Sequence, residues 1–297
     1  RPFIPYTIKC FKHQDYPMDK IEWIIIDDGT DKIEDLVSDI SQVKYFKYDE
    51  KMSLGKKRNI MHEKSKGDII VYMDDDDYYP PERVSHSVNM LLSHPNALCA
   101  GASEIYIFFK HKQEMIQCGP YGPNHATAGT FSFRKELLKH SKYEEHAAIA
   151  EERAFLKDYT IPFAQMDPLK TILVFSHEHN TFDKRKMYDN AHPQFFKPSD
   201  KTVNSFIRKD NEQNIKDFFL RDIDEKLKVY EPGEPKNKPD VLEQIKEIEN
   251  KREVMIKEEM EKQKKNAPIM IQQPGQEPKQ LTSQEVVSIM QNQLQDL

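Results

Sequence analysis

IIVYMDDDD, the stretch from Ile69 to Asp77, places a short apolar run directly before four consecutive aspartates. An apolar run of this length, with an abrupt polar stop, is typical of a strand buried within a sheet. The aspartates would then lie at the carboxyl end of that strand. Because neighbouring carboxylates repel one another, the cluster indicates either a bound cation or an acidic turn kept in water.

The residues on both sides of this stretch alternate between strand and helix patterns. Ser53 is placed to cap a helix and Gly67 to end it. The expected elements are strands at Ile21–Ile26, Val43–Tyr48 and Ile69–Met73, and helices at Asp31–Ile40, Leu54–Lys66 and Glu82–Ser93. This alternation predicts an α/β fold with a mainly parallel sheet and helices on both faces. Ligands bind such sheets beyond the carboxyl ends of the strands, where both Asp27–Asp28 and Asp74–Asp77 are expected.

The Asp74–Asp77 run favours a divalent metal. Alternate side chains of an extended segment share a face, so Asp74 and Asp76 are expected to point the same way. Carboxylate oxygens suit Mg²⁺ or Mn²⁺, and such sites commonly combine one or two carboxylates with substrate phosphates. The short basic run Lys56–Arg58 is too small to bind a nucleic acid backbone, but it suits a smaller anion such as a diphosphate.

Three acidic or basic motifs occur in a fixed order along the chain. They are Asp27-Asp28-Gly29-Thr30, then Gly55-x-x-Arg58-Asn59, then Asp74-x-Asp76-Asp77 followed by Pro81. In order and spacing they resemble the motifs of GT-A fold, family 2-like glycosyltransferases. The resemblance covers about residues 3–185 and implies a GT-A type (Rossmann-like) nucleotide-sugar-binding domain.

The resemblance also implies which residues bind the nucleotide sugar. In that family the leading aspartate of the first loop contacts the base, and the arginine lies near the nucleotide. The segment Ala128–Glu136 is similar to the family's strand and F-R-x-E motif, which borders the donor sugar and the acceptor. The binding residues so implied are Asp27, Asp28, Arg58, Asn59, Asp74, Asp75, Gly129 and Thr130.

Metal ligands and a catalytic base follow from the same resemblance. The implied metal ligands are Asp76, Asp74, His177 and His179, with His177 preferred because Asn180 gives the family's H-x-x-N spacing. Glu151 and Glu152 stand where the family has a Glu-Asp pair whose second member is the general base, so Glu152 is the expected base. Glu63 and Glu145 are alternatives, and the Glu pair is also a favourable acidic helix start.

The expected reaction is metal-dependent transfer of one sugar, by a single inverting displacement, from a UDP- or GDP-sugar to a glycan or protein hydroxyl. Mn²⁺ or Mg²⁺ is the expected cofactor. The Q-x-x-R-W motif of processive synthases is absent, since the single tryptophan is Trp23. The alternatives are a phosphohydrolase, a nucleotidyltransferase on a related fold and a non-catalytic sugar-nucleotide-binding scaffold.

Composition limits the possible partners and the cellular location of the protein. The formal net charge of −6 argues against a nucleic acid partner, and no apolar run reaches the roughly 18 residues of a membrane span. Three widely spaced cysteines favour a reducing compartment, here the cytoplasm. The Glu-rich and His-rich stretches resemble enzymes of large DNA viruses, which would imply the infected host cytoplasm. The family's first strand is expected upstream of Arg1, and a removed targeting segment stays an alternative.

Beyond about residue 200 the sequence becomes more polar. The expected division is a GT-A domain at 1–200, a helical extension at 201–230 and a tail at 231–297. The tail begins with a proline-punctuated linker, followed by a charged helix or weak coiled coil at 240–265. A Gln/Pro-rich stretch at 272–280, expected to be disordered, and a short amphipathic helix after Thr282 complete it. This tail is expected to bind a partner through its helix and to contribute nothing to the active site.

Overall fold

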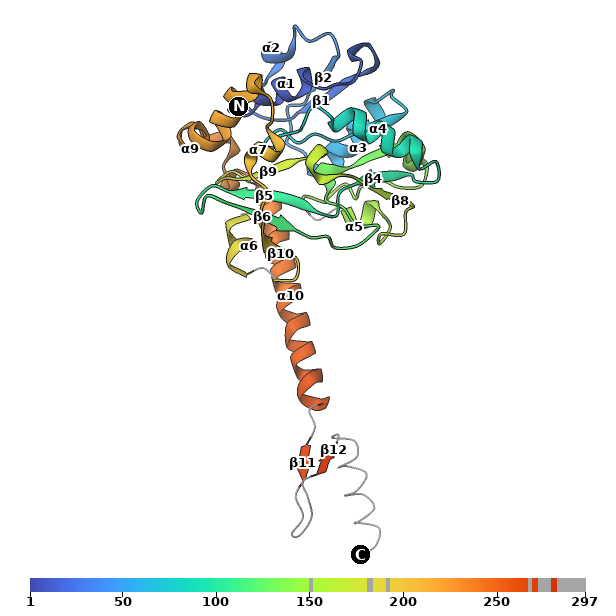
Figure 1. The fold of residues 1–297 in the computed structure, drawn as a ribbon, viewed down its shortest axis with the longest axis vertical. Coiled ribbons are helices and arrows are strands. Elements are labelled where there is room, and N and C mark those ends of the chain that lie inside the picture. The colour runs from blue at the N-terminus through green and yellow to red at the C-terminus, as the bar shows by residue number, and fades with distance from the viewer. Residues whose placement is uncertain (150–151, 181–183, 191–192, 267–268, 272–278, 282–297) are drawn as a thin grey trace, which may run out of the picture. The chain divides into compact units, whose positions relative to one another are not determined.

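The structure, a computed structural model, describes residues 1–149, 152–180, 184–190, 193–266, 269–271 and 279–281. The chain divides into two compact units, Arg1–Leu242 and Glu243–Leu297. Among the described residues, the first unit holds three sheets and most of the helices (Figure 1). It extends about forty residues past the expected end of the GT-A domain near residue 200.

The strands of the first unit form three sheets. They are β1 (Trp23–Asp27), β2 (Val43–Lys47), β3 (Ile69–Val71), β4 (Cys99–Gly101), β5 (Ile105–Phe109), β6 (Glu114–Cys118), β7 (Ser132–Arg134), β8 (Phe163–Gln165), β9 (Leu173–Ser176) and β10 (Phe196–Pro198). The sheet orders are β1-β2, β3-β7-β4-β8 and β10-β6-β5-β9. Pairs β1·β2, β4·β8 and β5·β9 are parallel, whereas β7 runs antiparallel to both β3 and β4. The α/β class is confirmed, with the difference that the strand directions are mixed rather than mainly parallel.

Helices and short helical turns connect and cover these strands. The α-helices are α1 (Ile4–Lys12), α2 (Glu34–Val37), α3 (Leu54–Lys64), α4 (Arg83–Ser93), α5 (Glu152–Phe155), α6 (Lys184–Asn190), α7 (Val203–Phe206), α8 (Gln213–Asp217), α9 (Ile223–Lys228) and α10 (Pro239–Asn266). A π-helical turn at Phe218–Asp222 joins α8 to α9.

The sheet β3-β7-β4-β8 is packed on both faces. Neighbouring residues of β4 point to opposite sides, so Ala100 packs with Leu91 of α4 while Cys99 packs with Phe133 and Phe155 in an aromatic cluster. This two-sided burial is what the apolar runs of the sequence predict.

Strand β1 does not join that sheet. A cavity of about 1080 Å³ is lined by residues of both β1 and β3, including Trp23, Ile24 and Ile69–Met73. The apolar residues Trp23–Ile26 are half-buried rather than enclosed on both sides, and Trp23 and Ile24 line this cavity.

Local sequence signals account for the start of α3 but not for its end. The Ser53 hydroxyl accepts a hydrogen bond from the Lys56 amide, as expected of a helix cap. The helix ends at Lys64, two residues before the expected end at Lys66, because Ser65 adopts an extended conformation. The amides of Lys66 and Gly67 instead donate to the carboxylate of Glu22.

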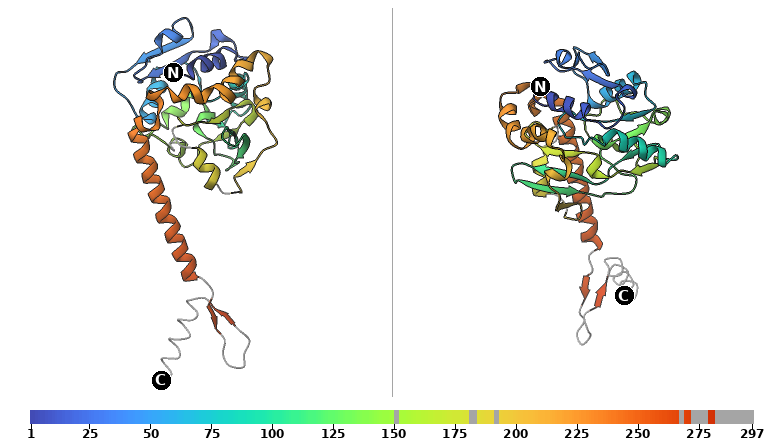
Figure 2. Two further views of the ribbon diagram at one scale, coloured as in Figure 1. Left: turned by 90° about the vertical axis from the view of Figure 1, so that its left-hand side faces the viewer. Right: turned by 45° about the horizontal axis from the view of Figure 1, so that its top comes forward.

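The chain from Val203 to Leu227 contributes large apolar side chains to the main core. Phe206 and Phe218 are fully buried there, beside Phe3 and Tyr78. Tyr6 of α1 stacks on Phe218 with ring centroids 3.7 Å apart, and Figure 2 shows α1 beside this late helical segment. Two ends of the first unit, far apart in sequence, therefore share one core.

The second unit contains most of α10 and a strand pair, β11 (Ile269–Ile271) with β12 (Lys279–Leu281). The helix matches the charged helix expected at 240–265, whereas Lys279 and Gln280 pair in β12 although disorder was expected there. The amphipathic helix expected after Thr282 lies outside the described residues. In the described part of the chain, no helix combines the length and apolar character needed to cross a membrane.

Candidate active site

A cavity of about 1000 Å³ opens where the predicted acidic motifs meet. Its walls come from the segments after β1, β2 and β3, from the start of α3, and from the residues following β9. Residues 230–241 form a further wall that the sequence did not predict. Among the residues predicted to bind donor or metal, the cavity is lined by Asp28, Arg58, Asp74, Asp75, Asp76, His177 and His179.

Asp76, His177 and Asn180 form a polar cluster in this cavity. Asp76 Oδ2 lies 3.3 Å from His177 Nε2 and accepts a hydrogen bond from the Asn180 side-chain amide at 3.3 Å. The same amide nitrogen lies 2.8 Å from His177 Nε2, and Asn180 Oδ1 accepts from the His177 backbone amide. Asn180 thus fixes both the imidazole and the carboxylate.

The charge states of this cluster suit a cation. Burial lowers the pKa of His177 despite the nearby Asp76 carboxylate, which favours the neutral imidazole. Although desolvation opposes ionisation, His177 and the positive charges of Lys184 and Lys238 hold the pKa of Asp76 below its usual range. A neutral imidazole nitrogen and a carboxylate oxygen then face each other.

The four aspartates do not alternate as expected of an extended segment. β3 ends at Val71, and Asp75–Asp77 form a bend. Asp77 is buried, and its carboxylate accepts from the Phe175 amide at 3.1 Å, so it ties the bend to β9. Asp75 opens onto the cavity, where desolvation by the walls and the charge of Asp76 raise the pKa of its carboxyl to about 6.

These residues fit a divalent metal in part. Among the described residues, no group of three His, Cys, Asp or Glu side chains is gathered into a preformed metal site. Asp76 and His177 offer two ligands, and Mg²⁺ or Mn²⁺ sites with one or two protein carboxylates are commonly completed by substrate phosphates. His179 lies further along the wall, where its ring faces Tyr230 with centroids 6.2 Å apart.

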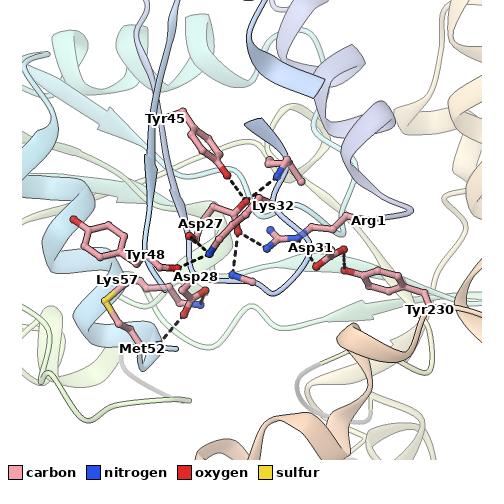
Figure 3. A network of polar contacts seen from close by, with 12 residues as sticks. Arg1, Asp27, Asp28, Asp31, Lys32, Tyr45, Tyr48, Met52, Lys57 and Tyr230 are labelled. Atoms are coloured by element: carbon pink, nitrogen blue, oxygen red, sulfur yellow. Dashed lines mark hydrogen bonds and ion pairs between the residues drawn. The ribbon is translucent and has the colours of Figure 1, made fainter. Parts of the chain in front are cut away.

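The loop after β1 is held by a dense polar network (Figure 3). The Asp27 carboxylate accepts from the amides of Gly29 and Ile33, from Tyr45 Oη at 2.7 Å, and from Arg1. These hydrogen bonds outweigh desolvation and lower the pKa of Asp27. The carboxylate predicted to contact the base is therefore occupied by its own chain and shapes the loop.

Asp28 reaches the cavity instead. Its Oδ1 pairs with Lys57 Nζ at 3.1 Å, and its Oδ2 accepts from the Met52 amide at 2.8 Å (Figure 3). This carboxylate thereby links the loops after β1 and β2 to the first turns of α3.

Arg58 and Asn59 of α3 differ in their roles. The Arg58 guanidinium lines the cavity and lies 5.0 and 5.2 Å from the ring centroids of Tyr72 and Tyr143. Although burial opposes its charge, the surrounding Tyr143, Tyr72 and Asp74 keep its pKa above the usual range. Asn59 exchanges two hydrogen bonds with the backbone of Tyr143 and so positions that segment rather than the cavity wall.

Gly129 and Thr130, which were predicted to bind the nucleotide sugar, do not line the cavity. Gly129 packs so closely on Asp74 that an added Cβ would lie 2.6 Å from its Oδ2. Thr130 is fully buried and accepts from the Ala102 amide at 3.0 Å, which makes it a structural residue of this turn. Glu152 Oε1 accepts from the Ala128 amide at 3.2 Å and is not part of the cavity wall, while Glu151 lies outside the described residues.

Sequence reasoning missed several cations and a tyrosine of the wall: Arg1, Lys51, Lys184, Lys238 and Tyr230. Lys57, which belongs to the basic run expected to suit a diphosphate, does line the cavity beside Arg58. Nothing in the pattern of the 230–241 segment distinguished Lys238 from the many exposed lysines around it. Its proximity to Asp75 and Asp76 depends on how residues 203–242 fold back on the sheets.

Comparison with solved structures shows similar chain paths at low sequence identity. S. aureus TarS residues 1–349 in complex with UDP-GlcNAc is 17% identical, with a TM-score of 0.44 over 59% of this chain and 55% of that chain. The mannosyltransferase PcManGT from Pyrobaculum calidifontis, in complex with GDP-Man and Mn²⁺, is 12% identical, with a TM-score of 0.48 over 64% and 61%. This chain therefore covers less than two thirds of either structure.

No curated protein matches the chain. A family does match: residues 1–159, more than half of the 297, fit the sequence model of Glycosyl transferase family 2. The motifs around Asp28, Arg58 and Asp74–Asp77 lie within that match and meet at one cavity. The protein belongs to glycosyl transferase family 2.

Proposed function

We propose that this protein transfers a single sugar from a UDP- or GDP-sugar to a hydroxyl of a glycan or protein acceptor, with a divalent metal and with inversion at the anomeric carbon. The observation that carries the proposal is the Asp76–His177 pair, which faces the same cavity as Lys57, Lys184 and Lys238. Oxygen and nitrogen ligands for a metal thus lie beside cations for a diphosphate. The volume of about 1000 Å³ suits a ligand as large as a nucleotide sugar.

Asp76 and His177 would hold Mn²⁺ or Mg²⁺, with Asn180 orienting both side chains. When bound, the metal would neutralise the negative charge that develops on the departing nucleoside diphosphate. The same negative charge would be stabilised by Arg58, Lys57 and the neighbouring lysines. Cations already positioned in a cavity stabilise such a charge without solvent reorganisation.

Glu152 is the proposed base that takes the proton from the acceptor hydroxyl. Its support is positional: Glu152 accepts from the Ala128 amide, and the turn that begins there brings Gly129 against Asp74. Glu152→Gln should keep donor binding but lower transfer by ~10²-fold or more, the usual size of a general-base contribution. Exposed Glu253→Gln serves as the control, and normal transfer by the Glu152 variant would reassign the base.

The deciding experiment incubates the protein with a panel of UDP- and GDP-sugars, with Mn²⁺, Mg²⁺ or EDTA, and measures release of the nucleoside diphosphate. Metal-dependent release supports the proposal. In a parallel incubation with UTP or GTP and sugar 1-phosphates, release of pyrophosphate would point to a nucleotidyltransferase, and binding of nucleotide sugars without turnover would point to a scaffold. NMR of the first-formed product gives the anomeric configuration, and retention would contradict the single displacement.

A further inference from the structure

Residues Tyr230–Val241, here named the C-terminal strap, close one side of the cavity. Tyr230 Oη donates to Asp31 Oδ2 at 2.6 Å, which fastens one end of the strap to the loop after β1 (Figure 3). Lys51, in the loop after β2, donates to the Asn237 carbonyl at 2.5 Å and lies 3.8 Å from Asp240. Both fastening points are themselves cavity residues, so the strap is built into the site.

The middle of the strap packs against His179. A Cβ added to Gly233 would lie 2.8 Å from His179 Nδ1, and Lys238 Nζ donates to the His179 carbonyl at 3.4 Å. The strap is thus held beside the residue two positions after His177, at the metal end of the cavity.

Lys238 carries a positive charge into the cavity without a matching ion pair. Its side chain is half-buried, and among the described residues it forms no ion pair, whereas Lys57 pairs with Asp28 and Lys51 with Asp240. Desolvation lowers the pKa of Lys238, opposed by the charges of Asp76 and Asp75. A charge removed from water is costly unless a partner is supplied.

We infer that Lys238 binds the diphosphate of the donor, so that the C-terminal strap supplies a phosphate-binding residue from outside the family-matched residues 1–159. The inference rests on the proposed function. An ammonium group is a suitable point charge for phosphate oxygens, and its three N–H donors are only partly used by the His179 carbonyl. Lys238 therefore favours nucleotides with two phosphates over those with one.

The test measures the affinity of UDP, GDP, UMP and GMP by calorimetry, with and without Mn²⁺, for the full chain and its variants. Lys238→Met removes the charge but keeps the aliphatic stem. Lys236→Met is the matched control, because Lys236 lies in the same strap but pairs with Glu231 and Glu234 and does not line the cavity. Lys238→Arg tests rescue by a retained charge.

Lys238→Met should weaken UDP or GDP binding about tenfold or more, as expected for a lost charge-assisted hydrogen bond, and change UMP or GMP binding much less. Lys236→Met should bind all four nucleotides like the unaltered protein, and Lys238→Arg should recover part of the loss. Unchanged diphosphate affinity in Lys238→Met, or an equal loss for monophosphates and diphosphates, would overturn the inference alone. If the unaltered protein bound no nucleoside diphosphate, the proposed function would fall and the inference with it.

Discussion

Asp74, Asp75, Asp76 and Asp77 are chemically identical, yet their surroundings give them different tasks. Asp77 binds the Phe175 amide, and Asp74 packs under Gly129. Asp75 opens to the cavity, and Asp76 alone among the four is paired with His177. The sequence indicated a metal-binding acidic cluster. It could not predict which aspartate has which role, because these roles depend on contacts with β9 and with the turn after Thr127.

Asp76→Asn should abolish metal-assisted sugar transfer while leaving the fold intact. The amide keeps the size of the side chain but loses the negative charge, so Mn²⁺ binding in the presence of a nucleoside diphosphate should weaken by more than ~100-fold, since even residues that only support a ligand cost 10- to 100-fold. Calorimetric titration of Mn²⁺ measures this. Asp68→Asn, which alters an exposed carboxylate outside the cavity, is the control. Full Mn²⁺ affinity in the Asp76 variant would remove this residue from the metal site.

His62 offers a test of burial at the residue scale. Its ring lies 2.5 Å from Tyr72 Oη, and burial, together with the charge of Arg58, lowers its pKa from 6.5 to about 4. The unfolded chain then binds the proton more readily, so the stability from neutral His62 is complete above about pH 6.5 and is lost as the pH falls towards 4. The full loss is about 3 kcal/mol at 1.36 kcal/mol per pKa unit.

Denaturant unfolding at pH 7, 6 and 5 measures this dependence. His62→Gln keeps a polar group for Tyr72 but cannot become protonated, so its stability should fall less steeply below pH 6.5. An identical pH dependence in both proteins would show that other groups cause the acid sensitivity.

At the scale of elements, the sequence predicted those features that depend on local signals. The Ser53 cap, the strand at β2 and the helix α4 lie where pattern and propensity placed them. The antiparallel insertion of β7 between β3 and β4 was not predictable, because it pairs segments about 30 to 60 residues apart through backbone groups that carry no sequence code. Similarly, the role of Asp27 as a loop anchor depends on Tyr45 and Arg1, which reach it from other elements.

Gly55→Ala should destabilise the start of α3 and reshape the cavity. An added Cβ would lie 2.1 Å from the Glu144 carbonyl oxygen, a backbone atom that cannot move aside alone. Gly55 also donates to the Ala147 carbonyl at 2.8 Å, and the next residues, Ala148 and Ile149, line the cavity. The cost should be roughly 1–3 kcal/mol, as for other overpacked sites.

Thermal unfolding and UDP or GDP affinity check the Gly55 prediction together. Gly122→Ala is the matched control, because its added Cβ would meet no atom closer than 4.0 Å. A Gly55 variant as stable as this control would show that the 144–149 segment adapts freely to α3.

For the whole molecule, the boundary of the catalytic unit is where expectation and structure differ most. The sequence predicts a helical extension at 201–230 and an independent tail from residue 231, whereas the first unit continues to Leu242 and buries apolar residues of the extension such as Phe206, Phe218 and Ile223. His13 Nδ1 lies 2.5 Å from Glu212 Oε1, a polar contact between the end of α1 and this later segment. A few apolar side chains are enough to keep a segment packed on the domain when each of them fills space in the core, since emptying such a space is costly.

Two truncations separate the strap from the rest of the tail. A chain that ends at Asn250 keeps the whole first unit, Arg1–Leu242, and should match the full chain in melting temperature and in UDP or GDP affinity. A chain that ends at Val229 loses the Tyr230–Asp31 hydrogen bond, the Lys51 contacts, Lys238 and buried Val241. It should melt several degrees lower, since about 1 kcal/mol shifts the melting temperature of a unit this size by about 2–4 °C, and it should bind the nucleotide more weakly. If the chain ending at Val229 bound and melted like the full protein, the strap would be dispensable and the tail would begin near residue 230, as the sequence alone suggested.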